Sequence, residues 1–354
     1  MKILLYGEFS GVHLNLQSGL RKLGYESVLA ARGDAWKAIR SNIPLGSNSE
    51  GLLGKISRGV TPLLKKNELV NYDVIQFMQA FEYYPHPGFR KWMEYLISNN
   101  EQSYLLAGGC DPYFFNNIDS TGLKYHPCPS CLKYDQKNST CAFASKYYVD
   151  WHERMLKKVN GVIPISESYG LLYKDIKKKK SRINMPVDLE SVEYRENKVK
   201  DKLVFFHGRN RYGFKGTFII EEAFEIVRKK YPQDIKLILN ERMPYDQYLE
   251  AINTANVIVD QIFGYGLGMN ALISMAKGKV VMTRYDSDLL SPLKPPAINV
   301  VPTVNDVVDT ITSVLERKNE IQEISAASRK YVEENHDSKK IAQQYLDVWR
   351  TVSV

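Results

Sequence analysis

The sequence predicts an α/β protein with two domains, each built on a parallel sheet that helices cover on both faces. Short apolar segments of strand length alternate with segments of helical periodicity through the first half of the chain, and the alternation starts again after Pro186. Alternation of this kind is typical of parallel sheets. The length of 354 residues also exceeds what one hydrophobic core usually organises.

The first series contains five expected strands and the helices between them. The strands are residues 2–6, 27–31, 72–77, 103–107 and 161–165. The helices are 13–23, 87–98 and 150–160, with a further one after 161–165. Gly24 suits the left-handed turn that ends a helix, Pro87 suits a first helical turn, and Ser166 is a favourable N-cap.

The second series repeats the pattern. Its expected strands are residues 202–206, 235–239, 257–260 and 279–283. Its expected helices are 217–230, 245–254, 268–277, 320–335 and 338–351, the last two with apolar residues at helical spacing. Between the two series, residues 190–202 are charged and poor in apolar residues, which places a domain boundary near 186–200.

Composition and charge narrow the function classes. No apolar run reaches the roughly 18 residues of a membrane-spanning helix, and the N-terminal apolar segment is too short for a signal peptide, so a cytoplasmic protein is expected. The net charge of +8 raises the question of nucleic acid, but no basic helix or RNA-binding signature is present. The cluster Lys177-Lys178-Lys179-Lys180 is either a solvated turn or a patch that docks on an anionic inner membrane leaflet.

One segment points to phosphate binding. The apolar run 203–206 ends at Gly208 and Arg209, and Lys215 and Gly216 follow just before the helix 217–230. Glycines let a ligand approach the backbone, and the start of a helix offers free N–H groups and a favourable dipole. Arg and Lys add charge-assisted hydrogen bonds. This pattern is typical of an enzyme that holds an activated, phosphate-bearing substrate.

The order of these motifs resembles the GT-B glycosyltransferases, specifically the retaining family 4 group. Residues 1–24 look like that family's opening strand, glycine loop and helix, 161–166 like the strand that ends its first domain, and 182–188 like its crossover. The pairs Gly208-Arg209 and Lys215-Gly216 match its Gly-Arg and Lys-Gly motif, with a spacing one residue longer than usual.

The resemblance implies two Rossmann-like domains that face an interdomain cleft. The acceptor-side domain would be residues 1–186, with a Cys-rich insertion at 110–146, and the donor domain would be 187–336. Residues 337–354 would form a C-terminal helix that crosses back to the first domain.

The resemblance also implies a reaction, the transfer of a sugar with retention. The donor would be a nucleotide-diphosphate sugar, and the acceptor a glycan or a lipid-linked glycan, in polysaccharide biosynthesis. Arg209 and Lys215 would neutralise the diphosphate as it leaves, and Gly208 would let it approach. Arg211 competes with Arg209 because of the longer loop. The family needs no divalent metal and has no secure protein nucleophile. Replacing Arg209 or Lys215 by Ala is expected to preserve folding and lower turnover.

The chain departs from the family at the second donor motif. Aligning residues 275–278 with the family's Met-Ala-x-Gly places Tyr265 and Ile273 where two glutamates usually bind the donor sugar and ribose. The remaining donor-side candidates are Asp260, Gly266, Gly268 and Asn270. The loss either redirects donor recognition or marks a catalytically inactive GT-B subunit that binds a partner transferase.

The expected acceptor side lies in the loops after the first-domain strands. Gly11 resembles the family glycine that lies against donor phosphate, and Glu8 and His13 stand in the same loop at the end of the first strand. The family often has a His at the position of Gly108; Asp111 is the nearest polar candidate here.

All four cysteines fall within one stretch of the chain, and they are Cys110, Cys128, Cys131 and Cys141. Clustered cysteines in a cytoplasmic protein favour a metal over a disulfide, and structural zinc takes four S or N ligands. His126 is an alternative to Cys110 as the fourth ligand. Residues 115–146 show little regular pattern, so a zinc clip would organise a costly loop. Reduced thiols and a redox-active disulfide are the alternatives.

Overall fold

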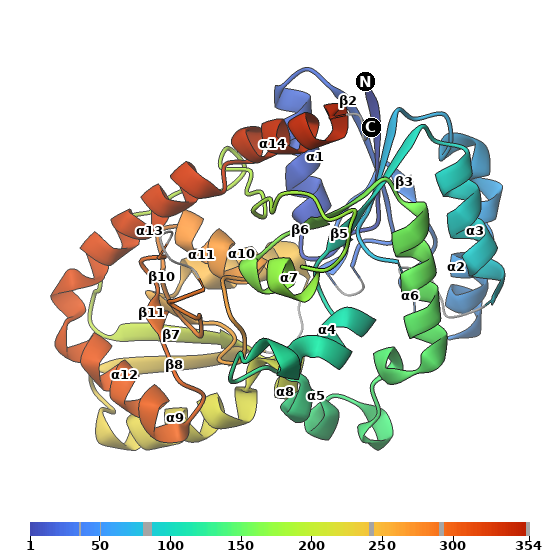
Figure 1. The fold of residues 1–354 in the computed structure, drawn as a ribbon. Helices are drawn as coiled ribbons and strands as arrows, with labels where there is room; N and C mark the ends of the chain where they lie inside the picture. The colour runs from blue at the N-terminus through green and yellow to red at the C-terminus, as the bar shows by residue number, and fades with distance from the viewer. Residues whose placement is uncertain (35–36, 50, 81–86, 241–243, 290–293, 352–354) are drawn as a thin grey trace. The chain divides into compact units, whose positions relative to one another are not determined.

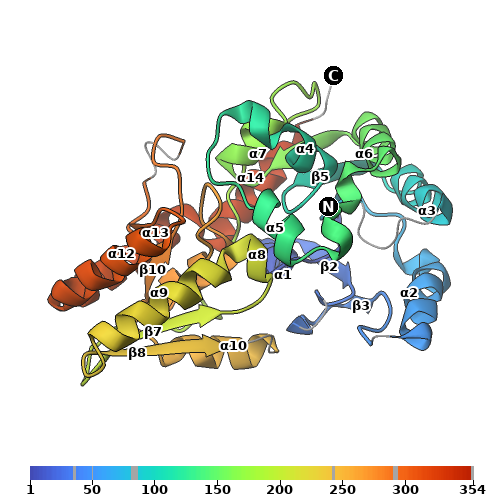
Figure 2. The ribbon, with the colours of Figure 1, turned by 90° about the horizontal axis from the view of Figure 1, so that it is seen from below.

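The computed structural model describes residues 1–34, 37–49, 51–80, 87–240, 244–289 and 294–351. Within these ranges two parallel sheets, of six and five strands, are flanked by helices (Figures 1 and 2). The predicted α/β fold class is therefore confirmed. The chain forms two compact units: the first is Met1–Thr121 with Ala142–Asp188 and Asp337–Val354, and the second is Gly122–Cys141 with Leu189–His336.

The sheet of the first unit has the strand order β3-β2-β1-β4-β5-β6. Its strands are β1 (Lys2–Tyr6), β2 (Glu26–Ala31), β3 (Ile43–Pro44), β4 (Val74–Phe77), β5 (Gln102–Ala107) and β6 (Gly161–Pro164). Chain order reverses between β1 and β4, because β1 pairs in parallel with β2 on one side and with β4 on the other. Ligands of open α/β sheets bind outside the carboxyl ends of the strands at such a reversal.

The helices of the first unit cover both faces of this sheet. They are α1 (Val12–Lys22), α2 (Leu52–Leu64), α3 (Pro87–Ser98), α4 (Pro112–Asn117), α6 (Lys146–Lys158), α7 (Glu167–Leu172) and α14 (Ser338–Arg350). On one face, the C-terminal helix α14 packs against α1 (Figure 1), as the fold class predicted. Their backbones touch at Gly19, where an added Cβ atom would lie 2.0 Å from the Ser338 carbonyl oxygen.

Two tryptophans join α3 and α6 to the first sheet. Trp92 Nε1 donates to the Tyr6 hydroxyl at 3.0 Å, and Trp151 Nε1 donates to the Ala80 carbonyl at 2.8 Å. The strands between the two helical layers are almost wholly buried; every residue of β4 and β6 is. This double burial explains why the strands appear in the sequence as continuous apolar runs.

The sheet of the second unit has the strand order β11-β10-β9-β7-β8. Its strands are β7 (Leu203–Gly208), β8 (Ile235–Asn240), β9 (Val257–Val259), β10 (Val280–Thr283) and β11 (Ile298–Asn299). Here chain order reverses between β7 and β9, because β7 pairs with β8 on one side and β9 on the other. The expected phosphate segment begins at the carboxyl end of β7.

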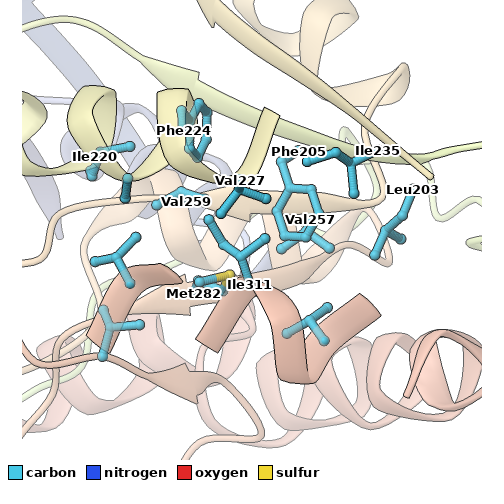
Figure 3. Close-up of a cluster of buried hydrophobic side chains, with 14 of the residues drawn as sticks. Leu203, Phe205, Ile220, Phe224, Val227, Ile235, Val257, Val259, Met282 and Ile311 are labelled. Atoms are coloured by element: carbon cyan, nitrogen blue, oxygen red, sulfur yellow. The ribbon is translucent and has the colours of Figure 1, made fainter. Parts of the chain in front are cut away.

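The helices of the second unit are α5 (Cys128–Tyr134), α8 (Tyr212–Lys215), α9 (Thr217–Lys230), α10 (Tyr245–Asn253), α11 (Met269–Ala276), α12 (Val304–Glu316) and α13 (Ile321–Asn335). Helices α9 and α12 pack together on one face of the sheet. Figure 3 shows Phe224 and Val227 of α9 and Ile311 of α12 pointing toward strand residues. Helices α11 and α13 pack on β10.

Short 3₁₀ helices complete the described secondary structure, at Lys66–Glu68, Ile118–Thr121, Lys137–Ser139, Ala142–Ala144 and Lys318–Glu320. No helix in the described ranges is long and apolar enough to cross a bilayer.

The expected Cys-rich insertion 110–146 is divided between the two units. Its middle part, Gly122–Cys141, belongs to the second unit, whereas the flanking parts belong to the first. Although the sequence of residues 115–146 shows little regular pattern, the segment contains α5, which packs on α8. The contact is close, because an added Cβ atom at Gly213 would lie 2.2 Å from the Ser130 carbonyl oxygen.

Candidate functional site at the carboxyl ends of β7 and β9

The turn between α8 and α9 depends on Gly216. Its φ of 75° lies in the left-handed region, and an added Cβ atom would lie 2.5 Å from the side chain of Ile262. Only glycine satisfies both conditions without strain. The Ile262 N–H also donates to the Lys215 carbonyl at 3.0 Å, so the loop after β9 holds the end of α8 in place.

Lys215 and Asp260 form a buried ion pair at the reversal between β7 and β9. The Lys215 Nζ atom lies 3.2 Å from Asp260 Oδ1, and the two residues are 7% and 3% exposed. An added Cβ atom at Gly268 would lie 3.7 Å from Asp260 Oδ2, so the start of α11 is adjacent. Three of the predicted donor-site residues therefore lie together.

Arg209 is held by a carboxylate that the sequence analysis did not single out. Arg209 Nη1 lies 3.1 Å from Glu221 Oε1, and the Tyr212 hydroxyl donates to Glu221 Oε2 at 2.8 Å. The hydrogen bond to Glu221 raises the pKa of Tyr212 to about 12. Glu221 thus fixes two side chains of the loop from the first turns of α9, and about a third of the Arg209 side chain stays accessible.

Arg211 has a different environment. Its backbone is left-handed, with φ 55°, and its guanidinium carbon lies 3.5 Å from the centroid of the Phe214 ring. A guanidinium over an aromatic face is a favourable cation–π contact. The structure does not decide between Arg209 and Arg211 as the donor ligand. They differ in that Arg209 pairs with Glu221, whereas Arg211 lies over the Phe214 ring.

His207 connects the strands to α9. Its Nδ1–H donates to the Val259 carbonyl at 2.7 Å, and its Nε2 accepts from the Thr217 hydroxyl at 2.9 Å. Burial lowers the pKa of His207 to about 3, so the ring is neutral. Because one nitrogen must donate to a carbonyl, the tautomer is fixed, and the side chain fixes the distance between β7, β9 and the start of α9.

Asp135 clamps α8 from the segment Gly122–Cys141. Its Oδ1 accepts from the Gly213 N–H at 3.0 Å and its Oδ2 from the Phe214 N–H at 2.7 Å. Next to it, the Tyr134 ring packs on Phe218 with centroids 4.7 Å apart. The carboxylate satisfies backbone donors that the first turn of a helix leaves without partners. The conformation of the loop that carries Lys215 therefore depends on this segment.

The two positions of the expected glutamates are closed to solvent. Tyr265 is 4% exposed and its hydroxyl donates to the Leu123 carbonyl at 3.4 Å. Ile273 is 1% exposed and belongs to the apolar side of α11. The other donor-side candidates, Gly208, Gly266 and Asn270, are half-buried.

In the first unit, Glu8, Gly11 and His13 come together in the loop after β1. Glu8 Oε2 accepts from the Leu14 N–H at 2.8 Å, and burial raises the pKa of Glu8 to about 7. His13 Nδ1–H donates to the Gly7 carbonyl at 2.7 Å, and burial lowers the pKa of His13 to about 4. Gly11, with φ 85°, is the N-cap of α1.

Asp111 is engaged by the fold. Its Oδ1 caps α4 through the Phe114 N–H at 2.7 Å, and its Oδ2 accepts from the Tyr173 hydroxyl at 2.8 Å. His152 Nε2 lies 2.7 Å from the same hydroxyl. Burial raises the pKa of Asp111 to about 6. Gln79, which the sequence analysis did not name, bridges the carbonyls of Gly108 and Cys110 at 3.1 Å each.

The four cysteines are divided between the two units. Cys110 belongs to the first unit and Cys128, Cys131 and Cys141 to the second, and all four are partly exposed. In the ranges that the structure describes, no three His, Cys, Asp or Glu side chains are placed to hold a metal ion. Zinc binding by Cys128, Cys131, Cys141 and either Cys110 or His126 stays a prediction for metal analysis.

No protein-family model matches the sequence, and a search of curated proteins gives no significant match. Solved structures are similar in fold. A sucrose-phosphate synthase from Thermosynechococcus elongatus is 13% identical, with a TM-score of 0.64 and 99% of each chain covered. Anabaena HepE, solved with UDP and glucose, is 11% identical, with a TM-score of 0.63 over 99% of this chain and 100% of HepE. WaaG, a glycosyltransferase involved in lipopolysaccharide biosynthesis, is 10% identical, with a TM-score of 0.61 over 99% of this chain and 100% of WaaG. The chain has the GT-B fold.

Proposed function

We propose that the chain is a glycosyltransferase that moves a sugar from a nucleotide-diphosphate donor to a hydroxyl acceptor. The observation that supports this most is the group of Lys215, Asp260 and Gly268 at the reversal between β7 and β9. In open α/β sheets this is where ligands bind. HepE, which shares the fold, has been solved with UDP-glucose, so UDP-sugars are the first donors to test.

The proposed mechanism is stabilisation of the leaving diphosphate. The bond between the sugar C1 and the phosphate oxygen breaks, the acceptor oxygen bonds to C1, and the proton of the acceptor hydroxyl passes to the departing phosphate oxygen. Negative charge grows on the diphosphate, where the Arg209 guanidinium and the Lys215 ammonium would neutralise it. Preorganised charges aimed at a developing anion usually give the largest catalytic effect. We assign no protein nucleophile. Retention of configuration and a hexosyl donor are part of the proposal by analogy with the family 4 group.

Donor recognition would differ from that of the family 4 group. Tyr265 and Ile273 are buried and offer no carboxylate to the sugar or ribose hydroxyls. The half-buried Asn270 amide and the backbone around Gly266 are the polar groups next to the start of α11. Loss of a charged hydrogen bond costs about 1.5–3 kcal/mol. We therefore expect weaker or redirected donor binding rather than none.

The acceptor is proposed as a glycan or lipid-linked glycan in cytoplasmic polysaccharide biosynthesis. This part rests on analogy with proteins of the same fold, of which WaaG is involved in lipopolysaccharide biosynthesis. Glu8 and His13, at the reversal between β1 and β4, are the first-unit candidates for contact with sugar or acceptor. Nucleic acid is not proposed as a partner.

A second candidate is an inactive GT-B subunit that binds a partner transferase. Two observations favour it: the glutamate positions are occupied by buried residues, and the Lys215 charge is already paired with Asp260. Such a subunit would keep the fold without binding a donor.

Nucleotide binding and an arginine substitution test the proposal. UDP, GDP and their sugars are added to the full chain in a thermal-shift assay, followed by transfer assays with the donor that binds. Arg209→Ala should lower turnover about 10²- to 10³-fold with folding retained. Arg228→Ala is the matched control, because Arg228 also lies near a glutamate on α9, Glu225, but outside the site. The absence of any nucleotide response would refute the enzyme, and full activity of Arg209→Ala would refute the role of Arg209.

A further inference from the structure

Helix α2 of the first unit presents its apolar side to solvent. Six large aliphatic side chains of this helix are exposed: Leu52, Leu53, Ile56, Val60, Leu63 and Leu64. Leu53 and Leu64 are the extremes, 82% and 78% exposed. In Figure 2, α2 lies at the edge of its unit, apart from α3 and α6. Soluble proteins rarely expose a contiguous apolar surface of this kind unless it binds something.

The outward orientation is built into the helix. At about 100° per residue the six side chains fall within one arc of about 120°, on the side opposite Gly54, Arg58 and Pro62. An added Cβ atom at Gly54 would lie 2.0 Å from the Ser49 carbonyl oxygen, so the helix backbone lies directly on the preceding loop. Pro62 is buried. The contacts of the inner side therefore hold the apolar side outward.

Arg58 fastens the same inner side. Its Nη1 donates to the carbonyls of Ser47 and Ser49 at 3.0 and 2.8 Å. If the helix rotated about its axis to bury the leucines, both hydrogen bonds of Arg58 would break. The close contact between Gly54 and the Ser49 carbonyl would be lost as well. The helix is thus fixed as a surface element.

The charges around this face select its partner. Residues 52–64 contain no acidic residue, and Lys55 and Lys66, at the start and just past the end of the helix, are exposed. Arg58 bonds the inner side, and Lys65 pairs with Glu68 at 3.0 Å. An amphipathic helix with an aliphatic face and basic flanks is the pattern that binds the interface of anionic membranes. We propose that α2 docks the protein on an anionic lipid bilayer, with its aliphatic face in the headgroup–acyl boundary. This inference does not depend on the proposed function.

A bilayer fits this face better than a protein does. The six exposed side chains are all leucine, isoleucine or valine, whereas protein interfaces concentrate their binding energy in Trp, Tyr and Arg. The cluster Lys177–Lys180, the other basic candidate, is partly engaged by the fold. Lys178 Nζ donates to the carbonyls of Lys157 and Val159, and Lys179 Nζ donates to the carbonyl of Gly170. The docking surface is therefore assigned to α2.

Vesicle flotation with the full chain tests the assignment. Vesicles of phosphatidylcholine alone are compared with vesicles that contain about 30% phosphatidylglycerol. The wild type should float with the anionic vesicles, and an increase in NaCl from about 0.1 to about 0.5 M should weaken binding severalfold. The double variant Leu53→Gln/Leu64→Gln should bind at least about tenfold more weakly. Leu171→Gln/Ile226→Gln, which changes two exposed apolar residues on other helices, should bind like the wild type.

The outcomes separate a bilayer from other occupants. All variants should melt like the wild type in circular dichroism, because the changed side chains are exposed. A wild type that ignores both vesicle types, or a Leu53→Gln/Leu64→Gln variant that floats as well as the wild type, would overturn the proposal. A dimer in light scattering that Leu53→Gln/Leu64→Gln dissociates, without vesicle binding, would assign the face to a second copy instead. Equal weakening by the control variant would show a nonspecific effect and would equally overturn it.

Discussion

The buried pair of Lys215 and Asp260 gives the sharpest test of the site. With Nζ and Oδ1 3.2 Å apart, the Coulomb attraction is about 5 kcal/mol at an effective dielectric constant of about 20. Removal of one partner from a buried pair leaves an uncompensated charge and costs about 3–5 kcal/mol. We therefore expect Lys215→Met to lower the free energy of unfolding by about that amount. The sequence alone predicted that loss of Lys215 would preserve stability, because it does not show the burial.

Urea unfolding and calorimetric titration with UDP measure the two roles of Lys215 separately. The double variant Lys215→Met/Asp260→Asn should lose less free energy of unfolding than the two single variants lose together, by about 1–3 kcal/mol. Lys215→Met should weaken UDP binding about 10- to 100-fold, since a charged hydrogen bond is lost. Lys279→Met is the control, because Lys279 is buried and donates to the carbonyls of Asn253 and Ala255. It should lose stability and keep its UDP affinity. Additive stabilities would refute the pair, and unchanged UDP affinity of Lys215→Met would refute the phosphate role.

Three further predictions concern other parts of the chain. Asp135→Ala should lower the free energy of unfolding by about 0.5–2 kcal/mol, through loss of the cap on α8, and should raise KM for the donor; an unchanged KM would disconnect the segment from the site. Burial raises the pKa of Glu8 from 4.5 to about 7, so the folded state binds the proton more tightly and stability falls as pH rises through that window. Glu8→Gln should remove that loss, gaining about 3 kcal/mol on the wild type between pH 4 and pH 8 in urea unfolding; parallel curves would contradict the burial argument. Metal analysis and thiol titration of the purified protein decide the zinc prediction, which four reactive thiols without zinc would eliminate.

Local sequence predicted the elements that local physics determines. Helix α9 has the expected bounds, and β7 begins within one residue of its expected start. Both were predictable because an apolar run followed by helical periodicity can be recognised from a few consecutive residues. Asp135 was not predictable in this way. Its partners Gly213 and Phe214 lie 78 and 79 residues away, and α5 and α8 are too short to show periodicity. Glu221 was missed because the sequence shows it only as one more acidic residue on a helix.

Helix α2 shows a second limit of sequence patterns. Periodicity identifies which side chains share a face, and an aliphatic face is ordinarily assigned to the core. The direction of that face depends on the other side of the helix. Here Gly54 and Arg58 meet the loop of residues 46–49 so closely that the leucines remain outside.

One of the two expected glutamate positions contacts the segment Gly122–Cys141. Tyr265, at one glutamate position, donates to the Leu123 carbonyl, and the Gly264 N–H donates to the Tyr125 carbonyl at 3.3 Å. The same segment caps α8 through Asp135. It therefore contacts both loops of the proposed donor site, so the tyrosine at 265 cannot be judged as an isolated substitution. A carboxylate placed at 265 would be buried against this segment, because Tyr265 is 4% exposed and its hydroxyl bonds the Leu123 carbonyl.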